Sequence, residues 1–112
     1  MTTSELQVAL SLEVLTESGG ERRITDWYVG DLLSHVMGRV GSGCAWITIQ
    51  SNLNVVAVAK LTDVACVILA EGVEISPAVV ARAKEQGVNL YRSAHTACEL
   101  IRKQDKLSRL TS

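Results

Sequence analysis

The chain has 112 residues, with 12 acidic and 11 basic side chains and a net charge of −1. This length suits one domain, and a hydrophobic content of 47% is too high for a disordered segment. The balanced charge offers no basic face for nucleic acid and no polybasic attraction to a membrane, so we expect neither as a partner.

Signals for export and for disulfides are missing from the sequence. Residues 1–15 lack the basic start and apolar run of a signal peptide, and no stretch approaches the roughly 18 apolar residues that span a membrane. The cysteines Cys44, Cys66 and Cys98 are odd in number and form no CxxC pair, which argues against a disulfide framework. We therefore expect a cytoplasmic protein in a reducing compartment.

The first third of the chain predicts two helices and two strands. Residues 4–10 favour a short helix and 12–16 a strand, although the alternation of apolar residues from Leu6 to Val14 also fits one strand. Residues 24–29 are rich in β-branched and aromatic side chains, which is typical of a strand. A helix is expected from Gly30-Asp31 to about Gly38.

Strands and helices alternate along the rest of the chain. The expected elements are a strand at 45–49, a helix at 55–61 capped by Asn52 or Asn54, a strand at 64–69, a helix from Ser76-Pro77 to Gly87, a strand at 88–91 and a helix starting at Ser93 or Thr96. The helix at 55–61 is apolar nearly all round, so we expect it to be buried on more than one side. This order predicts a single α/β domain with a largely parallel sheet and flanking helices.

No pattern indicates catalysis, a metal or a cofactor. His95 and Cys98 could share a helix face, but a structural zinc site needs four ligands. The Gly-rich residues 38–43 follow a helix and precede a strand, which is the reverse of a phosphate-binding loop. Cys44 directly follows the Gly-rich residues 38–43, which leaves an exposed thiol open as an alternative. We therefore expect no enzyme activity; a small thiol- or phosphate-using enzyme is the less favoured reading.

Polar residues follow three of the predicted strands. In a parallel sheet the carboxyl ends of the strands share one edge, where helix N-termini attract anions. The alternative is that these residues only cap helices and complete turns. The candidate ligand-binding residues are Gln50, Ser51, Asn52, Asn54, Glu71, Gly72, Ser93, His95 and Thr96.

Four stretches of the sequence resemble the DRTGG domain family. They are GDLLSHVMGR (30–39), AWITIQ (45–50), NVVAVA (54–59) and VILAEG (67–72). The family's Asp-Arg pair falls here at Ser51-Asn52, and its Thr-Gly-Gly falls at Ala70-Glu71-Gly72. An anion site built on that arginine is therefore not expected in this chain.

The resemblance implies one DRTGG-like domain over residues 1–112, with a fold like that of the N-terminal domain of HPr kinase. Family members are regulatory modules attached to phosphotransacetylases and CBS-containing pyrophosphatases. The resemblance thus implies a non-catalytic module, often a homodimer, that binds a small polar or anionic ligand or a protein partner. Small stand-alone relatives occur near iron-hydrogenase or redox genes, so a structural subunit of a larger complex is the alternative.

The carboxyl-terminal residues 103–112 form a basic tail. Arg102, Lys103, Lys106 and Arg109 are accompanied by only one acidic residue, Asp105. We expect a solvated helix end favoured by the helix dipole, and a small anionic docking patch is the alternative.

Overall fold

A five-stranded sheet with the strand order β1-β5-β4-β3-β2 forms the centre of the molecule. The structure is a computed structural model that describes residues 1–111. The strands are β1 (Glu13–Thr16), β2 (Asp26–Val29), β3 (Cys44–Thr48), β4 (Cys66–Leu69) and β5 (Leu90–Arg92). β1 is antiparallel to β5, and the other three pairs are parallel. The predicted α/β fold with a largely parallel sheet is confirmed.

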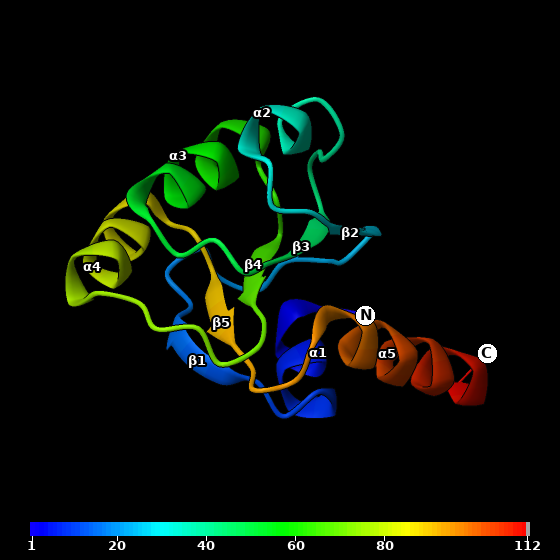
Figure 1. Cartoon of the computed structure of the whole chain (residues 1–112). Coiled ribbons are helices and arrows are strands. Elements are labelled where there is room, and N and C mark those ends of the chain that lie inside the picture. Colours follow the sequence, from blue (N-terminus) through cyan, green and yellow to red (C-terminus); the bar gives the residue numbers. More distant parts are fainter. Residues whose placement is uncertain (112) are drawn as a thin grey trace.

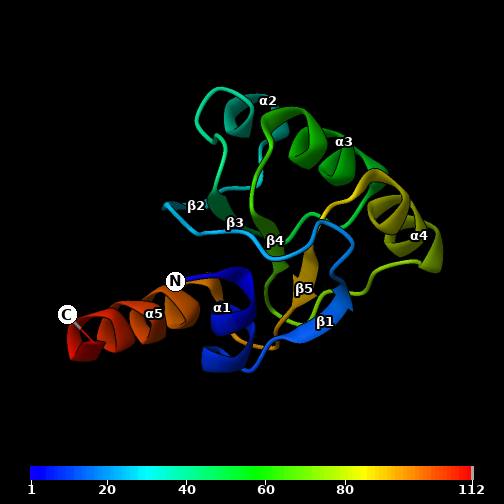
Figure 2. The same ribbon diagram turned by 180° about the vertical axis from the view of Figure 1, so that it is seen from behind.

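Helices cover both faces of this sheet (Figures 1 and 2). From β2 to β5, each strand lies next to the one before it in sequence, and the order across the sheet never reverses. Crossovers of one hand then put all their helices on one face. This face carries α2 (Leu33–Val36), α3 (Leu53–Thr62) and α4 (Pro77–Gln86), whereas α1 (Thr3–Ala9) and α5 (Ala97–Thr111) lie on the other.

The sheet separates two hydrophobic cores because successive side chains of a strand point to opposite faces. Trp46 packs in the core beneath α2, α3 and α4, while its neighbours Ala45 and Ile47 pack with α1 and α5. All five residues of β3 are buried, as expected for a central parallel strand covered on both sides. Tyr28 lies opposite Trp46 in the β2–β3 register, so one apolar row continues across this face.

Helix ends follow the capping signals of the sequence. The Ser76 side chain caps α4, Pro77 takes its first position, and Gly87 ends it with φ 72° in the left-handed region that suits glycine. Asn52, rather than Asn54, caps α3. Thr96 precedes α5 and exchanges hydrogen bonds with Glu99 in a capping box.

Two predicted helices differ from the structure. The helix expected from Gly30-Asp31 to Gly38 shrinks to the single turn of α2, because the Asp31 carboxylate bonds to the end of β3 instead of capping a helix. Burial of the helix at 55–61 on more than one side is confirmed only in part. The neighbours α2 and α4 cover the flanks of α3, but Leu61 on its outer side is 71% exposed.

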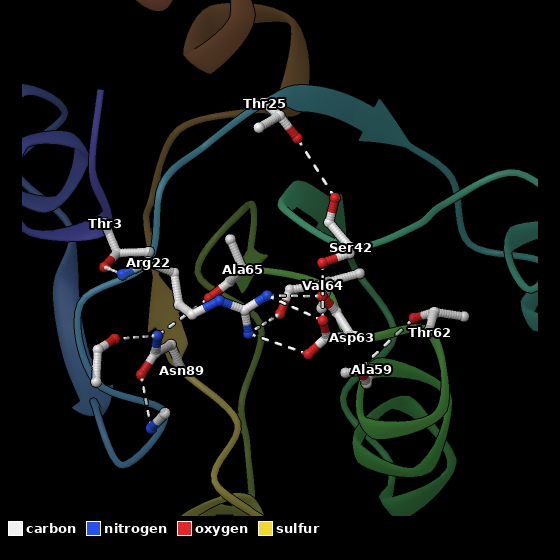
Figure 3. A network of polar contacts seen from close by, with 12 residues as sticks. Thr3, Arg22, Thr25, Ser42, Ala59, Thr62, Asp63, Val64, Ala65 and Asn89 are labelled. Carbon is white, nitrogen blue, oxygen red and sulfur yellow. Dashed lines mark hydrogen bonds and ion pairs between the residues drawn. The ribbon is translucent and has the colours of Figure 1, made fainter.

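A polar network joins the amino-terminal ends of the strands (Figure 3). The Arg22 guanidinium binds both carboxylate oxygens of Asp63 at 3.2 Å and the Asp63 carbonyl at 3.0 Å. The Asp63 carboxylate also accepts the Ser42 hydroxyl at 2.8 Å, and this bond, ahead of the Arg22 charge, lowers the pKa of Asp63. The network therefore ties the loop before β2 to the end of α3.

The buried amide of Asn89 completes this end of the sheet. Its Oδ1 accepts the Gly19 N–H at 2.9 Å, and its Nδ2 donates to the carbonyls of Gly20 at 2.8 Å and Ala65 at 3.0 Å. Only 2% of the Asn89 surface is exposed. One side chain thus holds the loop from 17 to 23 against β4 and β5.

The last described residues, 97–111, form the helix α5. The predicted basic tail at 103–112 belongs to α5 as far as Thr111, and Ser112 lies outside the described residues. Arg109 pairs with Asp105 at 3.0 Å one turn earlier, and both side chains are largely exposed. Within residues 1–111, no helix has the length and apolar character needed to cross a membrane.

We expect Asn89→Ala to lower the free energy of unfolding by about 2–3 kcal/mol, because it leaves the Ala65 carbonyl buried without a partner. The measurement is urea denaturation followed by circular dichroism. Asn54→Ala, at an exposed position, is the control and should change stability by less than about 0.5 kcal/mol. Equal losses in the two variants would contradict the role given to Asn89.

Candidate functional site

The carboxyl ends of β3, β4 and β5 meet at one edge of the sheet, which we call the rim. The turns after these strands are residues 50–54, 70–72 and 93–96, and they carry all nine candidate residues. Backbone bonds join the second and third turns, since the Glu71 N–H donates to the His95 carbonyl and the Gly72 N–H to the Ser93 carbonyl, both at 2.8 Å. These two N–H groups are therefore not available to a ligand.

The strand order shapes the rim. Deep ligand crevices in α/β sheets form where the strand order reverses, because the neighbouring crossovers then lie on opposite faces. Between β2 and β5 there is no such reversal. The rim consequently carries two open hollows rather than one crevice.

The first, which we call the helix-start hollow, lies where α3 and α4 begin. Its volume is about 530 Å³, and it is lined by Ser51, Asn52, Leu53, Asn54, Ser76 and Val79. Asn52 and Ser76 each use a side-chain oxygen to cap their own helix, accepting the N–H groups of Asn54 at 3.0 Å and Val79 at 3.4 Å. The lining is neutral, and the positive ends of two helix dipoles converge on it.

The second, the arginine hollow, has a volume of about 360 Å³ and is lined by Ser11, Glu13, Gly72, Arg92, Ser93 and Ala94. Arg92 forms an ion pair with Glu13 at 2.8 Å and reaches the Val73 carbonyl at 3.4 Å. Its side chain is 29% exposed. The Glu13 carboxylate neutralises the arginine, so this hollow has less attraction for an anion than its guanidinium alone would give.

Asp31 is a rim residue that the sequence reasoning missed. Its Oδ1 accepts the Thr48 hydroxyl at 2.8 Å and the Ile49 N–H at 2.9 Å. Beside it, the Trp46 indole donates to the Gly30 carbonyl at 2.9 Å. These bonds fasten the end of β2 to β3 and place a negative charge at this corner of the rim. The only sequence signal was an aspartate following a predicted strand.

His95 and Thr96 lie at the start of α5. The Thr96 backbone N–H is the main cause that lowers the pKa of Glu99, with smaller contributions from the Thr96 hydroxyl and from His95. His95 Nδ1 lies 3.5 Å from Glu99 Oε2, and the His95 N–H donates to Ser93 Oγ at 3.1 Å. Both residues thus stabilise the turn and the helix start.

The structure therefore divides the nine candidate residues. Ser51, Asn52 and Asn54 share the helix-start hollow, and Gly72 and Ser93 line the arginine hollow. The remaining four, which line neither hollow, are Gln50, Glu71, His95 and Thr96.

Reactive groups are sparse in the described part of the chain. Cys44 is buried, so the alternative of an exposed thiol at this position is wrong. Burial raises its pKa to about 11, and burial also raises the pKa of the Cys66 thiol. Cys98 is exposed, and the His95 imidazole, three residues earlier, is directed to Glu99. Among residues 1–111, no group of three His, Cys, Asp or Glu side chains could hold a metal ion.

No protein-family model and no curated protein matches the chain. Among solved structures, the chain is similar to the CBS and DRTGG domains of the regulatory region of Clostridium perfringens pyrophosphatase, complexed with the activator diadenosine tetraphosphate. The TM-score is 0.67 at 15% sequence identity, and the match covers 89% of this chain and 44% of that one. The fold of the present chain is therefore DRTGG-like. The chain spans less than half of the regulatory structure that it matches, and the likeness to HPr kinase stays a prediction.

We expect a thiol reagent at pH 8 to modify the native protein at Cys98 alone. Cys44 and Cys66 are buried, and their raised pKa values keep them as neutral thiols at this pH. Counting labelled sites by mass spectrometry should give one adduct on the native chain and three after denaturation. Labelling of native Cys98→Ser at the same rate as the unchanged chain would contradict this burial.

Proposed function

We propose that this chain is a non-catalytic regulatory or accessory module of the cytoplasm that binds a small anionic ligand at the rim and self-associates. The observation that carries the ligand part is the helix-start hollow, where two helix N-termini and four polar side chains surround one space. Helix N-termini attract anions through their free N–H groups and their dipole.

The lining narrows the class of ligand. The hollow has no arginine or lysine, and the N–H groups of Asn54 and Val79 are already capped, so binding would rely on hydroxyls, amides and the helix dipoles rather than on ion pairs. The Asp31 carboxylate at the β2 corner of the rim would repel an anion, so we expect the anion to lie nearer the start of α4. A phosphate group of a nucleotide fits this chemistry, and the structural relative is a regulatory region crystallised with a nucleotide activator.

We expect Asn54→Asp to weaken anion binding at least about tenfold while leaving the fold intact. The new carboxylate repels the ligand, yet a negative charge in the first turn stabilises a helix by about 0.3–1 kcal/mol. Calorimetric titration with diadenosine tetraphosphate, ATP and inorganic phosphate measures the effect. The matched control is Ser4→Asp, at the equivalent position of α1, which should bind like the unchanged chain.

Failure of all three anions to bind at millimolar concentration would refute the ligand part of the proposal. Equal weakening in the two variants would do the same, because the effect would then come from net charge rather than from the hollow.

The self-association part rests on the surface of α1 and α5. A hollow of about 530 Å³ between these helices is lined mainly by apolar side chains: Met1, Val8, Ala9 and Leu107, with Ser4 and Glu5 beside them. α5 extends beyond the sheet in Figure 1, and its Leu110 is 74% exposed. A helix of 15 residues is about 22 Å long, which gives a second copy a long surface to cover.

Charge supports a second copy as the occupant. Glu5 lies on the α1 side of this hollow, and α5 carries the exposed Lys103 and Lys106. A two-fold axis across the α1–α5 surface would bring Glu5 of one copy toward the basic helix of the other.

We expect the unchanged chain to sediment as a dimer and the double variant Val8→Glu with Leu110→Glu to sediment as a monomer. Both side chains are more than 70% exposed, so the change affects an interface and not the core. Leu61→Glu, at an equally exposed leucine on the opposite face, should remain dimeric. A monomer at every concentration of the unchanged chain would refute the self-association.

A further inference from the structure

A second apolar surface lies on the outer side of α3. It begins at Leu53, which also lines the helix-start hollow of the rim, and runs from there along the helix. Leu53, Ala57 and Leu61 recur at intervals of four residues, which places them in one stripe along the helix. All three are exposed, Leu53 at 45% and Leu61 at 71%. The opposite side of the helix already supplies the buried contacts with the sheet, so this stripe contributes nothing to the core.

The stripe forms one wall of a groove between α3 and α4. The groove has a volume of about 330 Å³, and α4 contributes Arg82 and Gln86 to it. Lys60 lines it from α3. Both basic side chains are exposed, and neither forms an ion pair within residues 1–111. The groove therefore combines an apolar wall with two positive charges, and its lining includes no carboxylate.

We infer that this groove, formed by Leu53, Ala57, Leu61, Lys60 and Arg82, is the docking site for an acidic amphipathic helix of a partner protein. Leucine-like side chains of the partner, repeated every three or four residues, would cover the α3 stripe. Carboxylates beside them would pair with Lys60 and Arg82. This inference does not depend on the rim ligand or on the dimer.

A second copy of the chain fits the groove less well. Packing α3 against α3 of another copy would bring Lys60 and Arg82 of both chains to one interface, where like charges repel. An acidic segment satisfies the charges that a second copy would bring into conflict.

The test uses two fluorescent peptides of about four helical turns with leucines at identical positions. Glutamates flank the leucines in one peptide, and lysines replace every glutamate in the other. Fluorescence anisotropy with the full chain should show that the acidic peptide binds at least about tenfold more tightly. Leu61→Ser should weaken its binding at least about tenfold, whereas Leu32→Ser, at a similarly exposed leucine outside the groove, should not change it.

Reversing the charges gives the decisive comparison. The double variant Lys60→Glu with Arg82→Glu should prefer the basic peptide. Thermal melts of this double variant and of Leu61→Ser should confirm that each remains folded. The inference is overturned if the unchanged chain does not distinguish the two peptides, or if the preference survives the charge reversal. It is also overturned if the chain forms a dimer that Leu61→Ser dissociates, since a second copy would then occupy the groove.

Discussion

The parallel pairing of β2, β3, β4 and β5 in one continuous direction is the constraint from which the other features follow. It puts α2, α3 and α4 on one face, leaves α1 and α5 to cover the other, and gathers the strand ends at one rim. The same order provides no reversal point, so the rim carries shallow hollows between helix starts. A site of this shape suits reversible binding better than it suits chemistry that must exclude water.

The two ends of the sheet differ in the polar contacts that their side chains make. At the amino-terminal end, Arg22 and Asp63 bind each other. The Asn89 amide bonds to the backbone of the loop before β2 and to the Ala65 carbonyl, and these contacts together fix that loop. At the carboxyl end, Asn52 and Ser76 cap their helices from exposed positions beside the helix-start hollow, whereas Ser93 is buried in its turn. The candidate ligand residues are not part of the network of Arg22, Asp63 and Ser42 or of the bonds made by Asn89.

Local signals predicted much of the fold, because the alternating elements and the capping residues Ser76 and Gly87 act within a few residues of sequence. Long-range partners were not predictable in the same way. The bond from Asp31 to the end of β3 shortened α2, and the pairing of Arg92 with Glu13 depends on β1 joining the sheet beside β5. The common rim followed from parallel strands, but its division into two hollows depends on the strand order, which no local pattern carries.

The two tryptophans lie in different layers of the molecule. Trp46 is fully buried beneath α3 and α4, whereas Trp27 packs against the core of α1 and α5. In a variant that retains only one of the two tryptophans, the fluorescence emission would therefore report on the unfolding of one side of the central sheet. Comparing two such single-tryptophan proteins during a denaturant titration would reveal whether both layers melt in one cooperative step or whether one layer loosens first.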